Sequence, residues 1–279
     1  MTDFSAGASP SPAMPPWHDP SPPHITAEML LAHRCERDGV TPESLALPPV
    51  LVATFQGASY QHLAARTGVA PPAARHDGTA IVGSLDIGKI PDSGRPVAVS
   101  RLPAGAPTAT LVLESAFVRG VRVVLVVGSA GSLRSDVPLG STVVVTEAAR
   151  EEGTSHHYLP ADVPTCADAE IGNLLMRSAA ACGVNPVRGP TWTTDAPLRE
   201  TAGAVKRHQA AGVTVVEMEA SAIFAVAQVR GVRAGVLVAV SDELFVPWRP
   251  GFHDEAYLTA LTRGIDAALL AAEHLTSQE

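Results

Sequence analysis

The chain of 279 residues is 46% hydrophobic and 17% charged, which is typical of a globular protein. Aromatic residues make up only 4%, so valine, alanine and leucine must fill the core. This favours a buried sheet flanked by helices over an aromatic-rich β-sandwich. The net charge is −8, and no run of lysine or arginine forms a stripe that could follow a phosphate backbone. Both features argue against nucleic acid as a partner.

The cysteines and the apolar runs indicate the compartment. Cys35, Cys166 and Cys182 have no metal-type spacing, and we expect them to be reduced thiols. The N-terminal sequence has no basic-then-apolar signal pattern, and no apolar run approaches the length needed to span a membrane. We therefore expect a cytoplasmic protein with no membrane partner.

Residues 1–23 are rich in proline, serine and alanine and are predicted to form a disordered leader. No linker divides residues 24–279, which we interpret as one domain. In chain order, the hydrophobic pattern predicts a helix over 26–37, a strand over 50–54, a helix over 59–66, a strand over 96–100, a helix over 108–119, strands over 121–127 and 141–146, a helix over 168–182, a strand over 213–216, a helix over 219–230, a strand over 232–240 and a helix over 254–275.

The last two helices have the clearest patterns. Ala220, Ile223, Phe224 and Ala227 recur at the spacing of one buried helix face, and from Tyr257 an apolar residue recurs at every fourth position. The alternation of strands and helices predicts a single α/β domain, with a central mixed, mostly parallel sheet flanked by helices on both faces. In open α/β sheets ligands bind beyond the carboxyl ends of the strands, so the residues at those ends are the first candidates for a site.

The first such junction is Gly128-Ser129-Ala130-Gly131-Ser132, directly after the strand predicted over 121–127. Glycines let backbone N–H groups approach an anion or a flat base, and the serine hydroxyls add donors. No Lys-Ser/Thr pair follows, so the segment is not a P-loop. The alternative is a tight strand-to-helix turn that requires glycine for steric reasons.

The second junction is Val216-Glu217-Met218-Glu219, between a predicted strand and a predicted helix. On an extended backbone Glu217 and Glu219 project to the same side. A carboxylate at Glu219 is stabilised by the helix dipole and can accept two hydrogen bonds from a vicinal diol, such as that of ribose. Met218 would pack under the sugar. The alternative is a carboxylate that only stabilises the helix.

The third junction is Ser241-Asp242-Glu243, after the strand predicted over 232–240. An aspartate at the rim of a buried sheet is partly desolvated, so it can hold a proton and donate it to N7 of a departing purine. The alternative is a helix or turn cap. All three junctions fall at carboxyl ends of predicted strands, where one pocket would form.

Taken together, these motifs resemble the nucleoside phosphorylase and nucleosidase superfamily, which includes purine nucleoside phosphorylase, uridine phosphorylase and methylthioadenosine nucleosidase. The most specific element is Glu-Met-Glu followed by Val-Ser-Asp. The resembling stretches occur in the family's order: Gly105-Ala106-Pro107, 128–132, 150–155, 193–196, 216–221 and 240–242. The resemblance implies a phosphorylase-like α/β fold and cleavage of the N-glycosidic bond of a nucleoside.

The resemblance also assigns roles. It implies that Glu219 and Met218 bind ribose and that Asp242 is the general acid. Gly128 and Ser129 would bind phosphate or the water that replaces it. The residues expected beside the base are Ala130, Gly131, Asp195, Pro197 and Ser241. No cofactor is expected, with inorganic phosphate as the co-substrate.

Pro23-His24-Ile25 resembles the start of the hexameric purine enzymes, whose equivalent histidine reaches the 5′-hydroxyl site of a neighbouring subunit. His24 would then contact ribose across a subunit interface, and the protein would be a trimer or hexamer. The alternative is an ordinary surface histidine. His156-His157 do not predict a metal site, because adjacent histidines on an extended chain point to opposite faces.

The chain departs from the family pattern at the acceptor site. Phosphorylases usually carry a Gly-Asp-Pro-x-Arg loop where this chain has no arginine in 52–59, and an arginine where this chain has Val126. A phosphate dianion in a cleft normally requires a guanidinium or equivalent donors. The hydrolytic relatives use an N-terminal glutamate, which 50–59 also lacks. A phosphorylase is the leading hypothesis, and a nucleosidase or a nucleoside-binding pseudoenzyme are the alternatives.

The base pocket departs as well, because Pro197-Leu198 replaces an aromatic residue that often follows Asp195-Ala196 in the family. Stacking on the base would have to come from elsewhere. The aromatic candidates are Phe55, Tyr158 and Trp192. Arg199 and Glu200 are either contacts to the base edge or surface charges.

Overall fold

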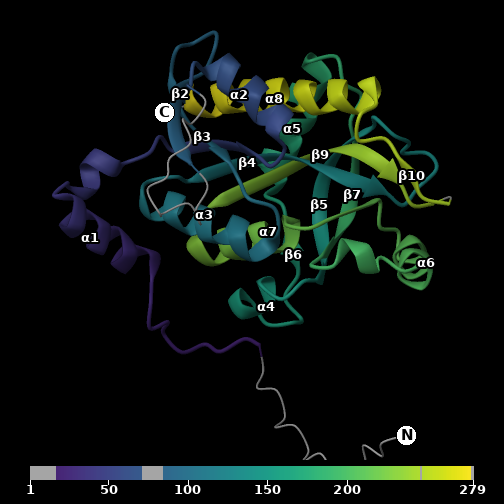
Figure 1. Ribbon diagram of the computed structural model, residues 1–279, viewed down its shortest axis with the longest axis horizontal. Coiled ribbons are helices and arrows are strands. Elements are labelled where there is room, and N and C mark those ends of the chain that lie inside the picture. Colours follow the sequence, from purple (N-terminus) through teal and green to yellow (C-terminus); the bar gives the residue numbers. More distant parts are fainter. Residues whose placement is uncertain (1–16, 71–83, 246, 278–279) are drawn as a thin grey trace, which may run out of the picture.

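A sheet covered by helices on both faces occupies most of the computed structural model, which describes residues 17–70, 84–245 and 247–277 (Figure 1). Most of the predicted leader therefore lies outside the described residues. The strands are β1 (Val50–Thr54), β2 (Leu85–Lys89), β3 (Pro96–Arg101), β4 (Val123–Ser132), β5 (Thr142–Glu151), β6 (Thr165–Cys166), β7 (Val187–Thr194), β8 (Val215–Glu217), β9 (Arg233–Glu243) and β10 (Arg249–Pro250).

The α-helices are α1 (Ala27–Asp38), α2 (Gly57–Thr67), α3 (Ala106–Val118), α4 (Ser155–Tyr158), α5 (Ala169–Ala181), α6 (Ala202–Ala210), α7 (Ala220–Arg230) and α8 (Glu255–Thr276), with 3-10 turns η1 (Pro42–Leu45) and η2 (Pro197–Arg199). No helix of the described ranges is both long and apolar enough to cross a membrane.

The strands pair in a mixed sheet, which confirms the predicted fold class. Parallel pairings join β3, β1, β4 and β9 in that order, and a second parallel set joins β5, β7 and β8. Antiparallel pairings connect the two sets, because β9 also pairs with β5 and β4 also pairs with β8. The path β4–β9–β5–β7–β8 thus closes on itself, which brings the ends of β4, β8 and β9 together.

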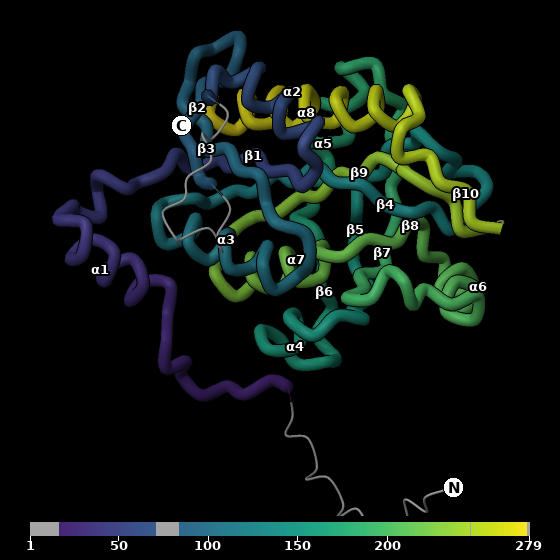
Figure 2. Tube along the Cα trace, viewed as in Figure 1, coloured from purple at the N-terminus to yellow at the C-terminus, as the bar shows by residue number. Residues whose placement is uncertain are grey.

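Two helical layers enclose this sheet. Helices α2, α5 and α8 cover one face and helices α3 and α7 cover the other, whereas α1 lies apart from the sheet (Figures 1 and 2). The predicted stripes are the buried faces: Leu261, Ile265 and Leu269 of α8 join one core cluster, and Ile223 and Phe224 of α7 join the other. The core is made chiefly of valine, alanine and leucine, as the composition predicts.

Some elements differ from the sequence-based expectation. Strand β7 was not predicted, because Gly189-Pro190 and four threonine or tryptophan residues replace the apolar run of a typical buried strand. Edge strand β2 and helix α6 were missed because polar residues interrupt their patterns. The structure also extends β4 to Ser132 and β9 to Glu243, beyond the predicted ends at 127 and 240.

Candidate active site

The segment 128–132 is part of β4, which corrects the expectation that it follows the strand and also excludes the alternative of a strand-to-helix turn. Pairing with β9 continues through it as far as Ser132 opposite Glu243, with a bulge between Ala130 and Gly131. A Cβ on Gly128 would lie 3.4 Å from a carbon of the Phe55 ring, which is an ordinary van der Waals contact. A Cβ on Gly131 would collide with Leu244 and lie 3.3 Å from the Asp242 carboxylate. Close packing therefore favours glycine at position 131.

The hydroxyl of Ser129 forms a 2.6 Å hydrogen bond with the hydroxyl of Tyr257, near the start of α8. Tyr257 is buried, and burial raises its pKa. The hydrogen bond to Ser129 opposes this rise, whereas the negative charge of Asp242 adds to it. Ser129 and Asp242 therefore both lie within electrostatic reach of the same phenol. The sequence suggested Tyr257 only as a core residue of the helix stripe.

Glu217 ends β8 and turns its carboxylate into the protein. One oxygen accepts a hydrogen bond from the Thr193 hydroxyl at 2.6 Å, and the other accepts from the amides of Glu219 at 2.8 Å and Ala220 at 2.7 Å. These amides belong to the start of α7, where backbone donors have no partner within the helix. Burial raises the pKa of Glu217, and its hydroxyl and amide donors oppose that rise. Glu217 thus anchors the first turn of α7.

Glu219 is the N-cap residue of α7, one position before the helix. Its side chain crosses to the start of α3, where Oε1 accepts a hydrogen bond from the Gly105 amide at 2.6 Å. Gly105 has φ of +96°, a conformation that favours glycine. Glu219 is 7% exposed, and burial together with the charge of Glu217 raises its pKa to about 8. Met218, between the two glutamates, is half-buried.

Asp242 lies within β9 and not after it, because its strand pairs with β4 and β10 as far as Glu243. Its Oδ1 accepts a hydrogen bond from the Ser241 hydroxyl at 2.8 Å, and its Oδ2 accepts from the Trp248 indole at 2.9 Å. The Ser241 hydroxyl also lies 3.3 Å from the carbonyl oxygen of Ala130. Two neighbouring strand ends therefore hold the Asp242 carboxylate in place.

Glu200 is half-buried and lies within electrostatic range of Asp242. Burial and the charge of Asp242 raise the pKa of Glu200 to about 7. The neighbouring Arg199, in η2, is exposed. Trp248 and Glu200 were both missed as partners of Asp242, since neither forms a local motif with it.

Two further residues expected beside the base, Asp195 and Pro197, lie at the surface. The Asp195 carboxylate accepts a hydrogen bond from the Gly153 amide at 2.9 Å. A cavity of about 410 Å³ lies beside this contact, between the first turns of α3 and the segment 153–158. Pro107 and Thr110 line its α3 side. The cavity therefore adjoins the Gly105 loop that contacts Glu219.

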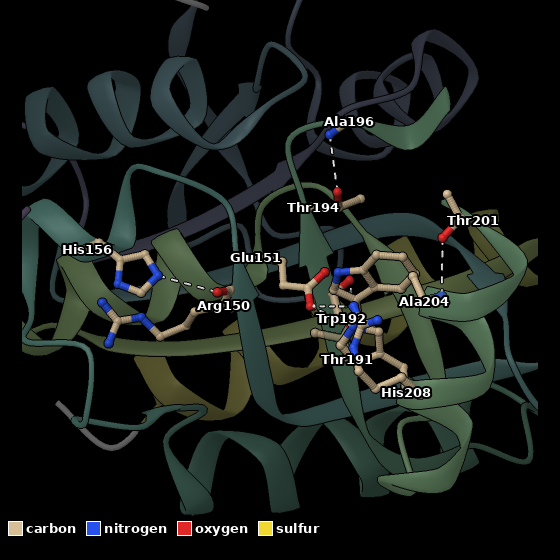
Figure 3. Close-up of polar contacts among 11 residues, drawn as sticks. Arg150, Glu151, His156, Thr191, Trp192, Thr194, Ala196, Thr201, Ala204 and His208 are labelled. Atoms are coloured by element: carbon tan, nitrogen blue, oxygen red, sulfur yellow. Dashed lines mark hydrogen bonds and ion pairs between the residues drawn. The ribbon is translucent and has the colours of Figure 1, made fainter. Parts of the chain in front are cut away.

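Of the three aromatic candidates for stacking, Phe55 lies against Gly128 of β4. Trp192 is buried and stacks on His208, with ring centroids 4.3 Å apart and planes 17° apart, and Glu151 lies beside this pair (Figure 3). It is therefore not free to stack on a base. The Tyr158 hydroxyl donates a hydrogen bond to Glu114 at 3.0 Å.

Two segments carry His24, His156 and His157, and His157 lines the cavity of about 410 Å³. The segment that contains His24 precedes α1, which stands apart from the sheet (Figure 1). His156 and His157 belong to the short helix α4 and not to an extended chain, and both rings contact Trp17. Within the described residues, no group of three histidine, cysteine, aspartate or glutamate side chains is arranged to hold a metal ion.

The chain belongs to the Phosphorylase superfamily, whose family model matches residues 50–271. It is 29% identical over 162 residues to uridine phosphorylase of Haemophilus influenzae, a match that covers 53% of this chain and 64% of that protein. It is 34% identical over 140 residues to guanosine phosphorylase of Halorubrum lacusprofundi, covering 50% of this chain and 58% of that protein. The chain thus spans less than two thirds of the length of these curated relatives.

The fold is similar to that of a solved structure, purine nucleoside phosphorylase from Toxoplasma gondii in complex with immucillin-H. The TM-score is 0.73 at 18% sequence identity, and the match covers 85% of this chain and 94% of that one.

Proposed function

We propose that the protein is a nucleoside phosphorylase, which cleaves the N-glycosidic bond of a nucleoside with phosphate to give a free base and a sugar 1-phosphate. One observation carries this proposal. Strand β8, which ends two residues before Glu219, and strand β9, which contains Asp242, converge on Gly131, because Gly131 is paired with Val216 of β8 and with Asp242 of β9. A carboxylate suited to a sugar diol and a carboxyl suited to a leaving base therefore flank the same strand end.

The sugar would bind at Glu219. Its carboxylate is fixed by the Gly105 amide, and its remaining lone pairs would accept hydrogen bonds from the 2′- and 3′-hydroxyls of ribose. Half-buried Met218 would pack against the sugar face. Because Glu219 is buried, the two hydroxyls would meet little competition from water, which strengthens their hydrogen bonds.

Asp242 would protonate the leaving base while phosphate attacks C1′ of an oxocarbenium-like sugar. Departure of the base leaves negative charge on its ring, and a proton delivered to N7 of a purine neutralises that charge. The Ser241 hydroxyl and the Trp248 indole would orient the Asp242 carboxyl for this transfer. This chemistry favours purines, with Ala130, Gly131, Asp195 and Pro197 near the base. Among the relatives, one is named for uridine and one for guanosine.

The acceptor would bind beside Gly128 and Ser129, at the end of β4. The phosphorylase names of the relatives support phosphate. The absence of arginine from 52–59 and from position 126 instead favours water, which would make the protein a nucleosidase. A nucleoside-binding protein without catalysis is the third alternative, which the presence of both Glu219 and Asp242 disfavours.

We further propose a cytoplasmic homo-oligomer, a trimer or hexamer. The resemblance of Pro23-His24-Ile25 to the start of the hexameric purine enzymes supports this proposal, because it would place His24 at the ribose site of a neighbouring subunit. Size-exclusion chromatography with light scattering tests the assembly, and a monomer at enzyme-assay concentrations would contradict it.

The experiment that tests the function is base release from a panel of purine and pyrimidine nucleosides, each with and without inorganic phosphate. Phosphate-dependent release with a sugar 1-phosphate as product supports the proposal. Equal release without phosphate, giving free sugar, would establish a nucleosidase. Nucleoside binding without release of any base would indicate a nucleoside-binding pseudoenzyme.

A further inference from the structure

We propose that Arg101 supplies the cation for phosphate, a role that rests on the proposed function. The guanidinium sites expected from the family pattern are absent from 52–59 and from position 126. Arg101 ends β3 at the carboxyl edge of the sheet, the same edge at which Ser129 lies. It was not predicted as a site residue, since its position in the chain matches neither expected arginine.

The register of the strands places Arg101 near Ser129. Thr54, the last residue of β1, pairs with Arg101 on one side and with Val127 on the other. Arg101, Thr54 and Val127 are therefore level across the three strands, and Ser129 lies two residues further along β4. Neighbouring strands are about 4.8 Å apart, so a long side chain on β3 can reach across β1 towards β4.

The Arg101 side chain takes that direction. Its Nε donates a hydrogen bond to the carbonyl oxygen of Phe55 at 3.2 Å, just beyond the end of β1. Its Nη2 lies 3.8 Å from the position that a Cβ on Gly57 would occupy. The ring of Phe55 in turn packs against Gly128. Phe55 therefore contacts both the Arg101 guanidinium and β4.

The guanidinium is available to a ligand. Arg101 is exposed and forms no ion pair among the described residues, whereas Arg134 and Arg233 each pair with an aspartate. Only its Nε has a hydrogen-bond partner there, which leaves the terminal N–H groups free for an anion. Guanidinium groups bind phosphate through such paired donors, and charge-assisted hydrogen bonds of this kind are among the strongest in proteins.

Together, the Arg101 guanidinium and the Ser129 hydroxyl would hold the phosphate dianion from two sides of the β1 end. The backbone amides that begin α2 face the same turn, and Gln56 does not cap them with its side chain. They would add donors to a site whose charge comes from Arg101. This arrangement would replace the missing arginines with one from a different strand.

The test compares Arg101→Gln and Arg101→Lys with the control Arg95→Gln. Arg95 is also exposed, and its replacement by glutamine removes the same charge as Arg101→Gln. It precedes β3, at the opposite end of the strand from Arg101. Initial rates are measured while inorganic phosphate is varied at a saturating nucleoside concentration, and thermal unfolding is recorded with and without phosphate. Circular dichroism checks that each variant is folded.

We expect Arg101→Gln to raise the KM for phosphate by about 10- to 100-fold, with a much smaller change in the KM for the nucleoside. Arg101→Lys should lie between it and the wild type, and Arg95→Gln should match the wild type. Phosphate should raise the Tm of the wild type and Arg95→Gln but not of Arg101→Gln.

An unchanged KM for phosphate in a folded Arg101→Gln variant would overturn the role of Arg101 and leave the phosphorylase intact. A wild type that releases base without using or binding phosphate would instead overturn the proposed function and this inference together.

Discussion

The backbone amide of Glu219 donates a hydrogen bond to the carboxylate of Glu217 at 2.8 Å. The two glutamates stand two residues apart, yet their carboxylates have different surroundings. Glu217 accepts hydrogen bonds from backbone amides and threonine hydroxyls, whereas Glu219 contacts the Gly105 loop across the site. Glu217 thus stabilises the junction that positions Glu219.

The first prediction separates these roles. Glu217→Gln should lower the free energy of unfolding by about 1–3 kcal/mol, because an amide NH₂ would face backbone donors and leave buried groups unpaired. Glu219→Gln should lower the free energy of unfolding less than Glu217→Gln does. It should weaken the binding of ribosides far more than the binding of 2′,3′-dideoxynucleosides. Urea unfolding and ligand titrations measure both effects. Equal binding of the two ligand classes by the wild type would contradict the role of Glu219.

The second prediction concerns pH and stability. The folded protein raises the pKa of Glu219 from 4.5 to about 8, so the folded state favours the protonated carboxyl. The resulting stability is fully present below pH 4.5 and is lost as the pH rises towards and through 8. Urea unfolding at several pH values should therefore give a shallower decline for Glu219→Gln than for the wild type. Parallel curves for the two proteins between pH 5 and 9 would contradict this.

The third prediction concerns the effect of Glu219 ionisation on riboside binding. Ribose hydroxyls donate to an ionised carboxylate, so riboside affinity should rise about tenfold between pH 7 and pH 9 as Glu219 ionises. The Asp242→Asn variant lets the titration be made without turnover. Adding Glu219→Gln to that variant should remove the pH dependence. A dependence that survives this change would have to arise from another group.

The fourth prediction addresses the general acid. Asp242→Asn should lower kcat by about 10²- to 10⁴-fold while nucleoside binding persists, because proton donation is lost and the side-chain shape is kept. Trp248→Phe is the comparison, since it keeps an aromatic ring but removes the indole N–H that bonds Asp242. It should reduce kcat less than Asp242→Asn does. An unchanged rate in Asp242→Asn would show that another group assists the leaving base.

The fifth prediction uses the 2.6 Å pair of hydroxyls of Ser129 and Tyr257. Ser129→Ala and Tyr257→Phe should each raise the KM for the acceptor, because Tyr257 fixes the orientation of the Ser129 hydroxyl. The double variant should be little worse than Ser129→Ala, since the two act as one unit. Effects that simply add would indicate that Tyr257 acts independently of Ser129.

The sequence predicts those parts of the fold whose residues follow a regular pattern. Helices α7 and α8 were predicted because buried residues such as Phe224 and Leu261 recur at helical spacing. Strand β7 was not predicted, because buried positions such as Thr193 carry polar side chains and do not form an apolar run. The Thr193 hydroxyl donates a hydrogen bond to Glu217. The closed path of strands was also not predictable, since pairing of β9 with both β4 and β5 is a tertiary property.

The same distinction applies to the site. Glu219 and Asp242 could be proposed from their places at strand ends. Their partners could not, because the contact of Gly105 with Glu219 joins residues 114 positions apart. The contact of Ser129 with Tyr257 likewise spans 128 positions. Local patterns carry no information on such pairs.

The reverse reaction tests the proposed function most directly. The protein is incubated with a free purine base and ribose 1-phosphate, and formation of nucleoside and inorganic phosphate is followed by chromatography and phosphorus NMR. A phosphorylase should form both products in equal amounts, and Asp242→Asn should form neither at a comparable rate. A preparation that releases base from the nucleoside but makes no nucleoside from ribose 1-phosphate would contradict phosphate as the acceptor.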